Sequence, residues 1–341
     1  MATYVPALHI AWVPSCRNRT CHAGSTSSSR AQEHTTLLGR APSRTHHTRR
    51  ARMGPLVDAS RNFRRSEHVC MASVDHPQTN NKPLPRLELL DRICEPIVTL
   101  QDKVLNFWAD LPGLKPLVVP EQFLKNDSSK FERVEDANAS KASVLYIENL
   151  FYEADKFRKL HLEVAVSGVG LEVLHIVMYP RVEYDLPIYA VDIVGFKGRV
   201  TFCIADLCPF SNDLSLPLKT EAALEKLAKS TLIKDSPTRE TPDWGLEIFS
   251  SQCAIIAPDT SDDVQSFLKF ASGALEVLLA EAGPLARSDE GQILETLASQ
   301  KRFSFHQLRN VKTRKVLEAS MGTEWTDRYM TEIMFDYPEY P

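Results

Sequence analysis

Residues 171–194, LEVLHIVMYPRVEYDLPIYAVDIV, hold two apolar runs on either side of a proline-containing turn. Val, Ile, Leu and Tyr dominate both runs, and such a composition is typical of buried β-strands. The first run carries one imidazole, His175, and the second carries one carboxylate, Asp192. The stretch therefore predicts two buried strands that bring a histidine and an aspartate into the core of the domain.

Strand patterns continue on both sides of this stretch. SGVG connects the second and third predicted strands and FKGR connects the last two, with glycine available for a positive φ. These short connections predict hairpins, and hence an antiparallel meander. The predicted strands are residues 143–148, 160–166, 171–178, 188–196 and 199–205.

Helical periodicity occurs before, between and after the strands. The strands are apolar on both faces, and a sheet that is buried on both sides needs helices on both sides. We therefore expect an α/β fold, a three-layer α/β/α sandwich with a central antiparallel sheet, in one domain at 78–341. The expected helices are 87–111 (bent or restarted at Pro96), 220–233, 263–282 and most of 288–335; residues 112–142 look irregular, and 243–258 predicts one more strand.

The first 77 residues differ from the rest of the chain. They contain 11 Arg, no Lys, four acidic residues and many Ser and Thr, without hydrophobic periodicity. Such a segment buries too little apolar surface to offset the entropy of ordering. Arg-rich, Ser-rich, acid-poor N-termini are typical of transit peptides. Residues 1–77 therefore predict a disordered plastid transit peptide, cut near residues 69–72, and a location in the chloroplast stroma; a mitochondrial peptide and a tail without function are the alternatives.

Charge and motifs exclude several classes of function for residues 78–341. This part carries 40 acidic residues against 29 Lys and Arg, a net charge of −11, whereas nucleic-acid binding needs a positive surface. No apolar run approaches the ~20 residues of a membrane-spanning helix. The sequence has no C-x-x-C pair, P-loop, G-x-S-x-G or complete dinucleotide fingerprint. We therefore expect no bound metal or organic cofactor.

One face of the predicted sheet gathers ionisable side chains. With a period of two, His161 and Glu163 share one face of their strand, and His175 and Asp192 follow on the next strands. Burial raises the pKa of a carboxyl group, and a partly neutral acid beside a histidine can donate and relay protons. These four residues are the candidate catalytic group. The alternative is a core histidine and an aspartate whose hydrogen bonds are simply satisfied.

The stretch FRKLHLEVAVSGVGLEVLHIVMYPRVEYDLPIYAVDIVGFKGRVTFCIADLCP resembles the core of the ferredoxin-dependent bilin reductases, and DWGLEIFS and NVKTRKVLEASMGTEWTDRYMTEIMFD resemble later blocks of that family. The resemblance covers residues 143–335. It implies an α/β/α sandwich with the bilin between the sheet and the C-terminal helices, no bound redox cofactor, and reduced ferredoxin as the external electron donor. Members with both the H-L-E triplet and a histidine in the following strand are the most similar. They imply reduction of biliverdin IXα to phycocyanobilin by sequential one-electron and proton transfers.

The resemblance also implies a role for each candidate residue. Asp192 matches the aspartate that protonates the bilin, and His175 matches its histidine partner. Glu163 matches the proton donor to the D-ring vinyl group, and His161 matches a supporting histidine in the same network.

Further residues match substrate-binding positions of the family: Thr201, Arg239, Asn310 and Lys312. Hydroxyl, guanidinium and ammonium groups suit the carboxylates of the bilin propionates. Val311 departs from the family, in which an acidic residue stands between the asparagine and the lysine. This leaves the A-ring regiochemistry open, so a bilin of phytochromobilin or phycoerythrobilin type, a chlorophyll-breakdown tetrapyrrole as substrate, and a non-catalytic bilin carrier are alternatives.

Ferredoxins are acidic, so an enzyme with a net charge of −11 needs a local positive patch for docking. The alternative for each basic residue is an ordinary solvated charge. We expect a monomer that binds biliverdin and ferredoxin and has neither a membrane span nor a nucleic-acid partner. The docking candidates are Lys156, Arg158, Lys159, Lys197, Arg199, Arg314 and Lys315.

Overall fold

The computed structural model describes residues 84–128, 144–232 and 236–339, so the predicted transit peptide at 1–77 lies outside the described residues. In these ranges eight strands form one sheet, and every paired neighbour is antiparallel. The order is β1-β3-β4-β5-β6-β7-β8, and β2 also pairs with β3. The strands are β1 (Lys115–Pro116), β2 (Lys125–Asp127), β3 (Leu145–Glu153), β4 (Phe157–Ser167), β5 (Leu171–Pro180), β6 (Ile188–Phe196), β7 (Arg199–Cys208) and β8 (Ala254–Ile256).

Glycine turns hold the long strands in the predicted meander. Lys197 and Gly198 both have positive φ, 52° and 81°, as in the type I′ turn that matches the twist of the flanking strands. Gly170, with φ 99°, closes the turn before β5, and a Cβ there would lie 2.7 Å from Cγ of Lys197. Strands β3 to β7 therefore follow one another across the sheet, as the sequence predicts.

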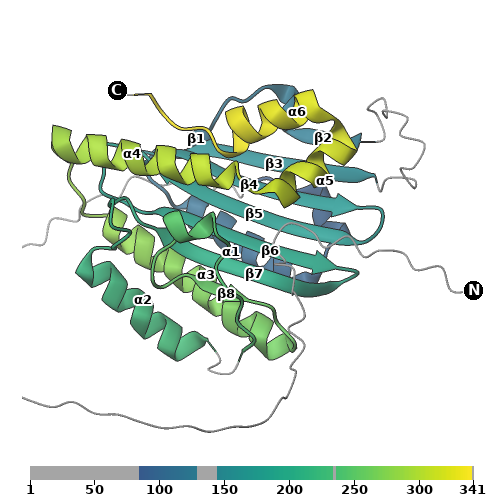
Figure 1. The fold of residues 1–341 in the computed structure, drawn as a ribbon, viewed down its shortest axis with the longest axis horizontal. Coiled ribbons are helices and arrows are strands. Elements are labelled where there is room, and N and C mark those ends of the chain that lie inside the picture. The colour runs from purple at the N-terminus through teal and green to yellow at the C-terminus, as the bar shows by residue number, and fades with distance from the viewer. Residues whose placement is uncertain (1–83, 129–143, 233–235, 340–341) are drawn as a thin grey trace, which may run out of the picture. The chain divides into compact units, whose positions relative to one another are not determined.

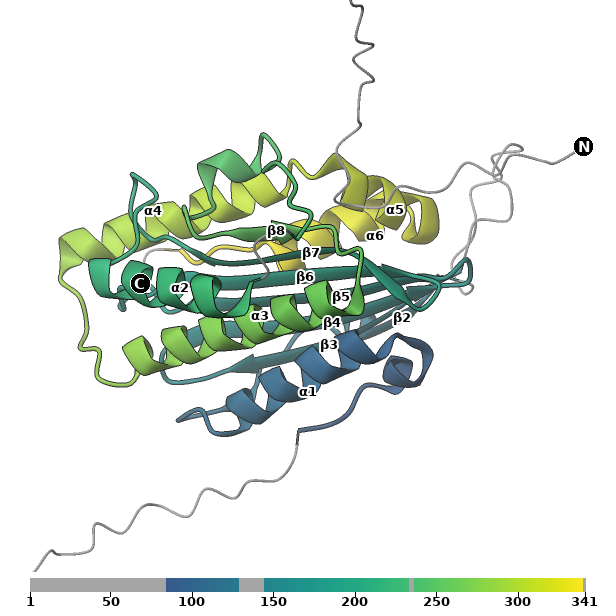
Figure 2. The ribbon, with the colours of Figure 1, turned by 90° about the horizontal axis from the view of Figure 1, so that it is seen from below.

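Helices cover both faces of this sheet (Figures 1 and 2). The structure thus confirms the predicted α/β/α sandwich with a central antiparallel sheet. One layer contains α1 (Glu95–Ala109), α3 (Ser261–Ala282) and, beside α3, α2 (Leu218–Thr231). The other contains α4 (Glu290–Gln307), α5 (Val311–Met321), α6 (Thr323–Arg328) and the π-helical turn η5 (Tyr329–Met334); short 3-10 turns are η1 (Glu88–Arg92), η2 (Glu121–Phe123) and η4 (Gly245–Glu247).

Alternate residues of each long strand enter two separate cores. In β5, Ile176 and Met178 pack toward α1 and α3, while Leu171 and Val177 pack toward the C-terminal helices. This division follows from the period of two along a strand. The second core carries the polar side chains of the candidate site.

The structure departs from the sequence-based expectation in the irregular regions. Residues 112–142 contain β1 and β2. The sequence of β2, KND, has no apolar alternation, and this segment is a strand because its backbone pairs with β3. Within 243–258 only Ala254–Ile256 is a strand, since the chain first turns at Gly245, where a Cβ would lie 2.6 Å from the Phe249 ring. Strand β3 continues beyond Glu148 to Glu153, and this extension adds a residue to the candidate site.

Candidate active site

Four polar side chains lie in one row across the sheet. Asn149 on β3 is directly opposite Glu163 on β4, Glu163 is opposite His175 on β5, and His175 is opposite Asp192 on β6. Directly opposed residues of antiparallel strands project from the same face, which here faces α5 and the π-helical turn. The structure therefore brings Glu163, His175 and Asp192 together, as the strand alternation predicts.

His175 and Asp192 form a buried ion pair. His175 Nδ1 lies 2.6 Å from Asp192 Oδ1, and the residues are 5% and 8% exposed. Burial alone would lower the pKa of His175, but the charge and hydrogen bond of Asp192 raise it above its ordinary value. The protonated imidazole is therefore favoured, with Nδ1–H donating to Asp192. Its buried Nε2 has no protein partner among the described residues.

Glu163 joins a second polar group beside His175. Its Oε2 contacts the hydroxyl of Tyr329, which also lies 2.9 Å from Asn149 Oδ1. His161 Nε2 lies 2.8 Å from the same asparagine oxygen. Burial raises the pKa of Glu163, and burial with the nearby charge of His175 lowers that of His161 well below its ordinary value. Glu163 therefore holds its proton more readily than an exposed glutamate would, and His161 is a neutral imidazole that donates from Nε2.

Glu163, His175 and Asp192 form the polar floor of a cleft between the sheet and the C-terminal elements. The cleft has a cavity volume of about 60 Å³ and opens to solvent. An apolar cleft with a few convergent polar groups of shifted pKa is the usual form of an active or binding site. The remaining lining is mostly apolar: Leu145, Ala165, Leu171, Val173, Val194, Val316, Leu317, Met334 and Phe335, with Gln307, Asn310 and Thr313.

Two predicted residues support the cleft rather than offer a free polar group to it. His161 is fully buried; its ring stacks on Phe151 at 4.4 Å and lies edge-on to His175 at 5.5 Å. Asn310 lines the cleft, but its side-chain oxygen caps α5 by accepting from the backbone N–H of Thr313 at 3.3 Å. Both side chains therefore stabilise the structure around the cleft.

The other predicted binding residues lie outside the cleft lining. Thr201 is exposed, and its hydroxyl already donates to the carbonyl of Val194 at 3.1 Å. Arg239 and Lys312 are half-buried, and neither side chain has an ion pair within the described residues. Burial and the nearby charge of Arg239 lower the pKa of Lys312. These two cations therefore lie close enough to repel each other. Val311, beside them in sequence, is 56% exposed.

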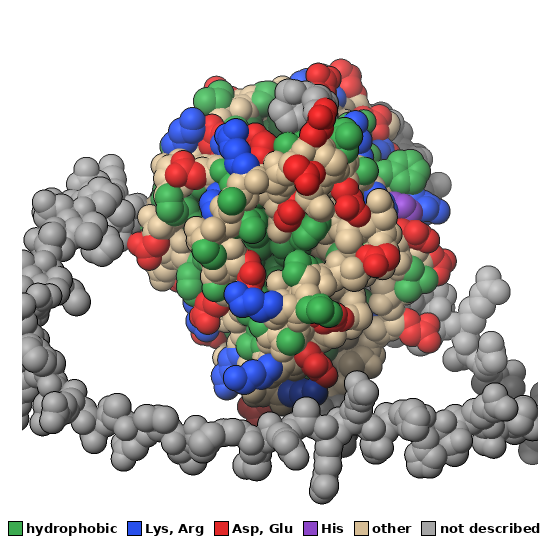
Figure 3. Space-filling view, turned by 90° about the vertical axis from the view of Figure 1, so that its left-hand side faces the viewer, with side chains coloured by type: hydrophobic (Ala, Val, Ile, Leu, Met, Phe, Trp, Pro, Cys, Tyr) green, Lys and Arg blue, Asp and Glu red, His purple; other side chains and the backbone are tan. Residues whose placement is uncertain are grey.

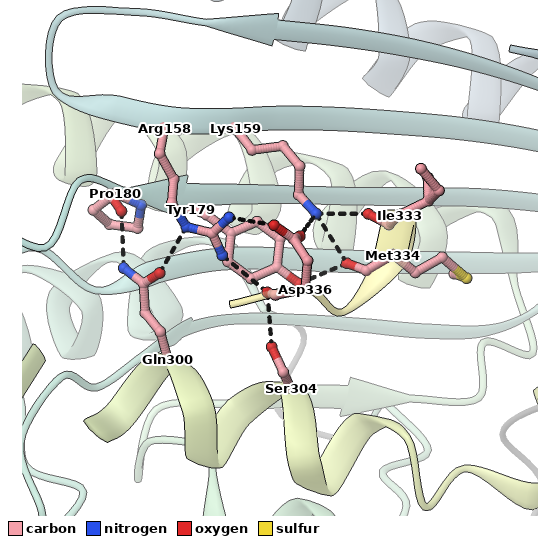
Figure 4. A network of polar contacts seen from close by, with 9 residues as sticks. All are labelled: Arg158, Lys159, Tyr179, Pro180, Gln300, Ser304, Ile333, Met334 and Asp336. Carbon is pink, nitrogen blue, oxygen red and sulfur yellow. Dashed lines mark hydrogen bonds and ion pairs between the residues drawn. The ribbon is translucent and has the colours of Figure 1, made fainter. Parts of the chain in front are cut away.

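A polar network fixes the segment that closes one side of the cleft (Figure 4). Asp336 pairs with Lys159 and, at 2.7 Å, with Arg158. Lys159 Nζ also donates to the carbonyl of Ile333 at 2.6 Å, and Tyr179 donates to that of Met334 at 2.8 Å. Burial alone would raise the pKa of Asp336, but the two cations lower it. We call Arg158, Lys159 and Asp336 the C-terminal latch.

The latch determines where the last cleft residues lie. Met334 and Phe335 directly precede Asp336, and both line the cleft. The Phe335 ring stands edge-on to His175, with ring centroids 6.0 Å apart. The latch therefore keeps an aromatic ring against the imidazole of the ion pair.

The same network corrects the docking prediction. Lys159 has a side chain only 5% exposed, so the prediction that it lies on a docking surface is wrong. Arg158 is committed to Asp336 and Gln300, and Lys156 donates to the carbonyls of Ala282 and Leu285. Lys156 precedes β4, and Arg158 and Lys159 lie at its start, where the β4–β5 register is irregular between Phe157 and Lys159. Lys197, Arg199 and Lys315 are exposed, while Arg314 pairs with Glu318 and Asp327.

Sequence reasoning missed two members of the site. Asn149 lay one residue beyond the predicted end of its strand, and a longer strand would have placed it opposite Glu163. Tyr329 comes from a π-helical turn far away in sequence, and no local pattern connects it to Glu163.

Two global features concern the described residues only. Among 84–128, 144–232 and 236–339, no group of three or more His, Cys, Asp or Glu side chains is placed to hold a metal ion. Across the same ranges, none of the helices combines the length and apolar character needed to span a bilayer.

Known proteins of one family are similar to this chain in sequence. The sequence model described as ferredoxin-dependent bilin reductase matches residues 101–336. Phycocyanobilin:ferredoxin oxidoreductases from Trichodesmium erythraeum (strain IMS101) and Synechococcus sp. are each 40% identical over 195 residues, or 57% of this chain and 78% and 77% of theirs. A solved structure of tomato phytochromobilin synthase in complex with biliverdin aligns with a TM-score of 0.54, covering 70% of this chain and 81% of that one. At 17% sequence identity, this alignment shows only that the two chains share a fold.

The ion pair predicts how His175 titrates. We expect the pKa of His175 to lie above its ordinary value and to fall in Asp192→Asn, because burial then acts without the opposing charge. NMR of the imidazole nitrogens over a pH series measures both values. Asp206→Asn is a matched control, since Asp206 is equally buried on β7 but bonds to Ser250. An unchanged titration in Asp192→Asn would contradict the assigned pair.

The latch predicts the stability of the C-terminal segment. Asp336→Asn leaves Lys159 with a buried charge and no carboxylate, which costs about 3–5 kcal/mol in a fully buried pair. Because the Asp336 side chain is 31% exposed, we expect a smaller loss of unfolding free energy, about 2 kcal/mol. Hydrogen exchange of the amides at 329–336 should accelerate.

The control for the latch is Glu332→Gln in the same segment. It removes an exposed pair with Arg328, which is worth less than about 1 kcal/mol. Equal exchange rates in the Asp336 variant and the unmodified protein would show that the latch does not hold the segment.

Proposed function

This chain belongs to the ferredoxin-dependent bilin reductase family of oxidoreductases, and we propose from that premise that it reduces biliverdin IXα to phycocyanobilin with electrons from reduced ferredoxin. The observation that carries the proposal is the row of Glu163, His175 and Asp192 on the floor of an apolar cleft. The names of the two relatives at 40% identity support the choice of product.

The reaction needs proton donors inside the cleft. It adds four electrons and four protons to an open-chain tetrapyrrole, and ferredoxin supplies single electrons without protons. Each reduced bilin radical must therefore take its proton from the protein. Transfer from Glu163 breaks an O–H bond, forms a C–H bond on the substrate and leaves a carboxylate; transfer from His175 leaves a neutral imidazole beside Asp192. Because the cleft is open to solvent, both groups can be reprotonated between steps.

Arg239 and Lys312 support a place for the propionates. Their mutual repulsion contributes to the lowered pKa of Lys312, and a carboxylate between them would relieve it. Thr201 fits this role less well, because its only proton is donated to Val194 and a carboxylate accepts but does not donate. The propionate contacts of this proposal therefore rest on the two cations.

Val311 bears on which bilin is formed. Its exposed apolar side chain cannot hold a proton where other family members carry an acid. The protons for the A-ring must then come from Asp192, His175 or water. A product of phytochromobilin or phycoerythrobilin type remains the second candidate, because its distinction from phycocyanobilin lies in which ring is reduced.

Ferredoxin docking is proposed at the end of the sandwich where the β6–β7 hairpin lies. Lys197 and Arg199 are exposed there, and the backbone N–H of Lys197 donates to the carbonyl of Gly170, next to the cleft residue Leu171. The opposite end, at the α3–α4 connection, shows Lys and Arg interspersed with acidic side chains (Figure 3). A patch of one sign attracts an acidic partner better than a mixed surface.

The test of function is anaerobic incubation with biliverdin IXα and a ferredoxin-reducing system, followed by chromatography and mass spectrometry. We expect a bilin with four additional hydrogens that co-elutes with phycocyanobilin. Asp192→Asn should stall at a radical and lose about 10²–10⁴-fold in rate, the usual contribution of general acid–base catalysis, while Asp206→Asn should not stall. A bound pigment without spectral change would favour a carrier, and a product with two additional hydrogens would favour another reductase.

Docking is tested by charge reversal. We expect Lys197→Glu with Arg199→Glu to raise the apparent KM for ferredoxin severalfold at low salt, and less at high salt, because screening weakens steering. The control is Lys219→Glu with Lys226→Glu, which makes the same charge change on α2. This helix lies on the side of the sheet opposite the cleft. An equal rise in both double variants would place docking elsewhere.

A further inference from the structure

Tyr329 presents one proton to two acceptors. It is fully buried, and its hydroxyl oxygen contacts Glu163 Oε2 and lies 2.9 Å from Asn149 Oδ1. The asparagine cannot turn its amide nitrogen toward Tyr329, because that nitrogen donates to the carbonyl of Phe123 at 2.8 Å. Its oxygen also accepts from His161. Tyr329 therefore stands between two oxygens, only one of which can receive its proton.

The number of protons shared by Glu163, Tyr329 and Asn149 determines in which charge state of Glu163 every hydrogen bond can form. If Glu163 is protonated, its O–H donates to the Tyr329 oxygen, and the Tyr329 O–H donates to Asn149. If Glu163 is ionised, the Tyr329 O–H must turn to the carboxylate, and two acceptor oxygens of Tyr329 and Asn149 then face each other at 2.9 Å. While Asn149 holds the Tyr329 proton, the protonated acid is favoured, the direction in which burial moves the pKa of Glu163; donation from Tyr329 to the carboxylate moves that pKa the other way.

The ring of Tyr329 is held firmly in place, so its hydroxyl oxygen stays between Glu163 and Asn149. It begins the π-helical turn Tyr329–Met334, a rare element that is frequent at functional sites. Its ring stacks on Trp325 at 4.5 Å and on Phe123 at 5.8 Å. At the other end of the turn, Lys159 binds the carbonyls of Ile333 and Met334 (Figure 4). A packed ring and a clamped turn leave rotation of the hydroxyl proton as its main freedom.

We propose that Tyr329 is a positioning residue whose oxygen accepts the O–H of protonated Glu163 and which, once Glu163 has delivered its proton into the cleft, turns its own O–H from Asn149 to stabilise the new carboxylate. The inference rests on the proposed function, in which Glu163 gives its proton to a bilin radical whose electron came from ferredoxin. The Glu163 O–H bond breaks, a C–H bond forms on the substrate, and Tyr329 keeps its proton throughout. Reprotonation of Glu163 returns the hydroxyl to Asn149.

The test reads the carboxyl group of Glu163 directly in the ligand-free protein. Infrared difference spectra over a pH series, with Glu163→Gln to assign the band, report its protonated C=O stretch. Tyr329→Phe should move the band to higher frequency and its midpoint to higher pH, because the carboxylate loses its donor. Asn149→Leu should move the midpoint to lower pH, because the Tyr329 proton is then free for the carboxylate.

Tyr189→Phe is the matched control. Tyr189 is equally buried, and its hydroxyl donates to the carbonyl of Ala271 at 3.0 Å on the other face of the sheet. This variant should leave the Glu163 band unchanged. The inference is overturned if Tyr329→Phe leaves the band and midpoint unchanged, if Asn149→Leu moves the midpoint upward, or if the unmodified protein shows no protonated Glu163 at neutral pH.

Turnover separates this inference from the proposed function. In the anaerobic assay, Tyr329→Phe should lower kcat for reduction of the vinyl group roughly tenfold, less than loss of the acid itself, with KM unchanged. If the unmodified protein does not reduce biliverdin, the proposed function fails, and the infrared titrations still decide whether Tyr329 governs the protonation of Glu163.

Discussion

The register of three antiparallel strands is the constraint on which the rest of the structure depends. His175 and Asp192 can be buried because each lies directly opposite the other, so that desolvation of the two charges is offset by their pairing. A slip of one residue would turn every side chain of a strand to the other face. His175 would then enter the apolar core under α1 and α3, without a partner. The turn at Lys197 and Gly198 fixes β6 against β7, and the cross-strand row follows.

The two faces of the sheet have different roles. The core beneath α1 and α3 is built from apolar side chains such as Leu160, Leu162 and Ile176, all fully buried. The opposite face combines an apolar core with buried polar groups and an open cleft. There the last segment is held by the ion pairs of the C-terminal latch as well as by packing. A fold of this kind can bury polar groups on one face while the other face supplies hydrophobic stability.

Local sequence pattern was sufficient for part of this picture. Alternation along 160–166, 171–178 and 188–196 predicts the strands, and it places Glu163, His175 and Asp192 on one face, because the period of two is a local property. It could not distinguish Arg158 and Lys159 from surface charges, since their partner Asp336 is distant in sequence. The polar β2 and the π-helical turn are also set by tertiary contacts rather than by periodicity.

The borders of the sheet have a consequence for behaviour at high protein concentration. The strands that end it, β1, β2 and β8, are only two or three residues long, whereas β4 and β5 have 11 and 10 residues. Long apolar strands with free backbone groups are templates for aggregation. Here β4 and β5 lie in the interior of the sheet. Among the described residues, β8 pairs with β7 at residues 203–205, so an incoming chain meets β7 only in the short stretches on either side of that pairing, which limits intermolecular strand addition.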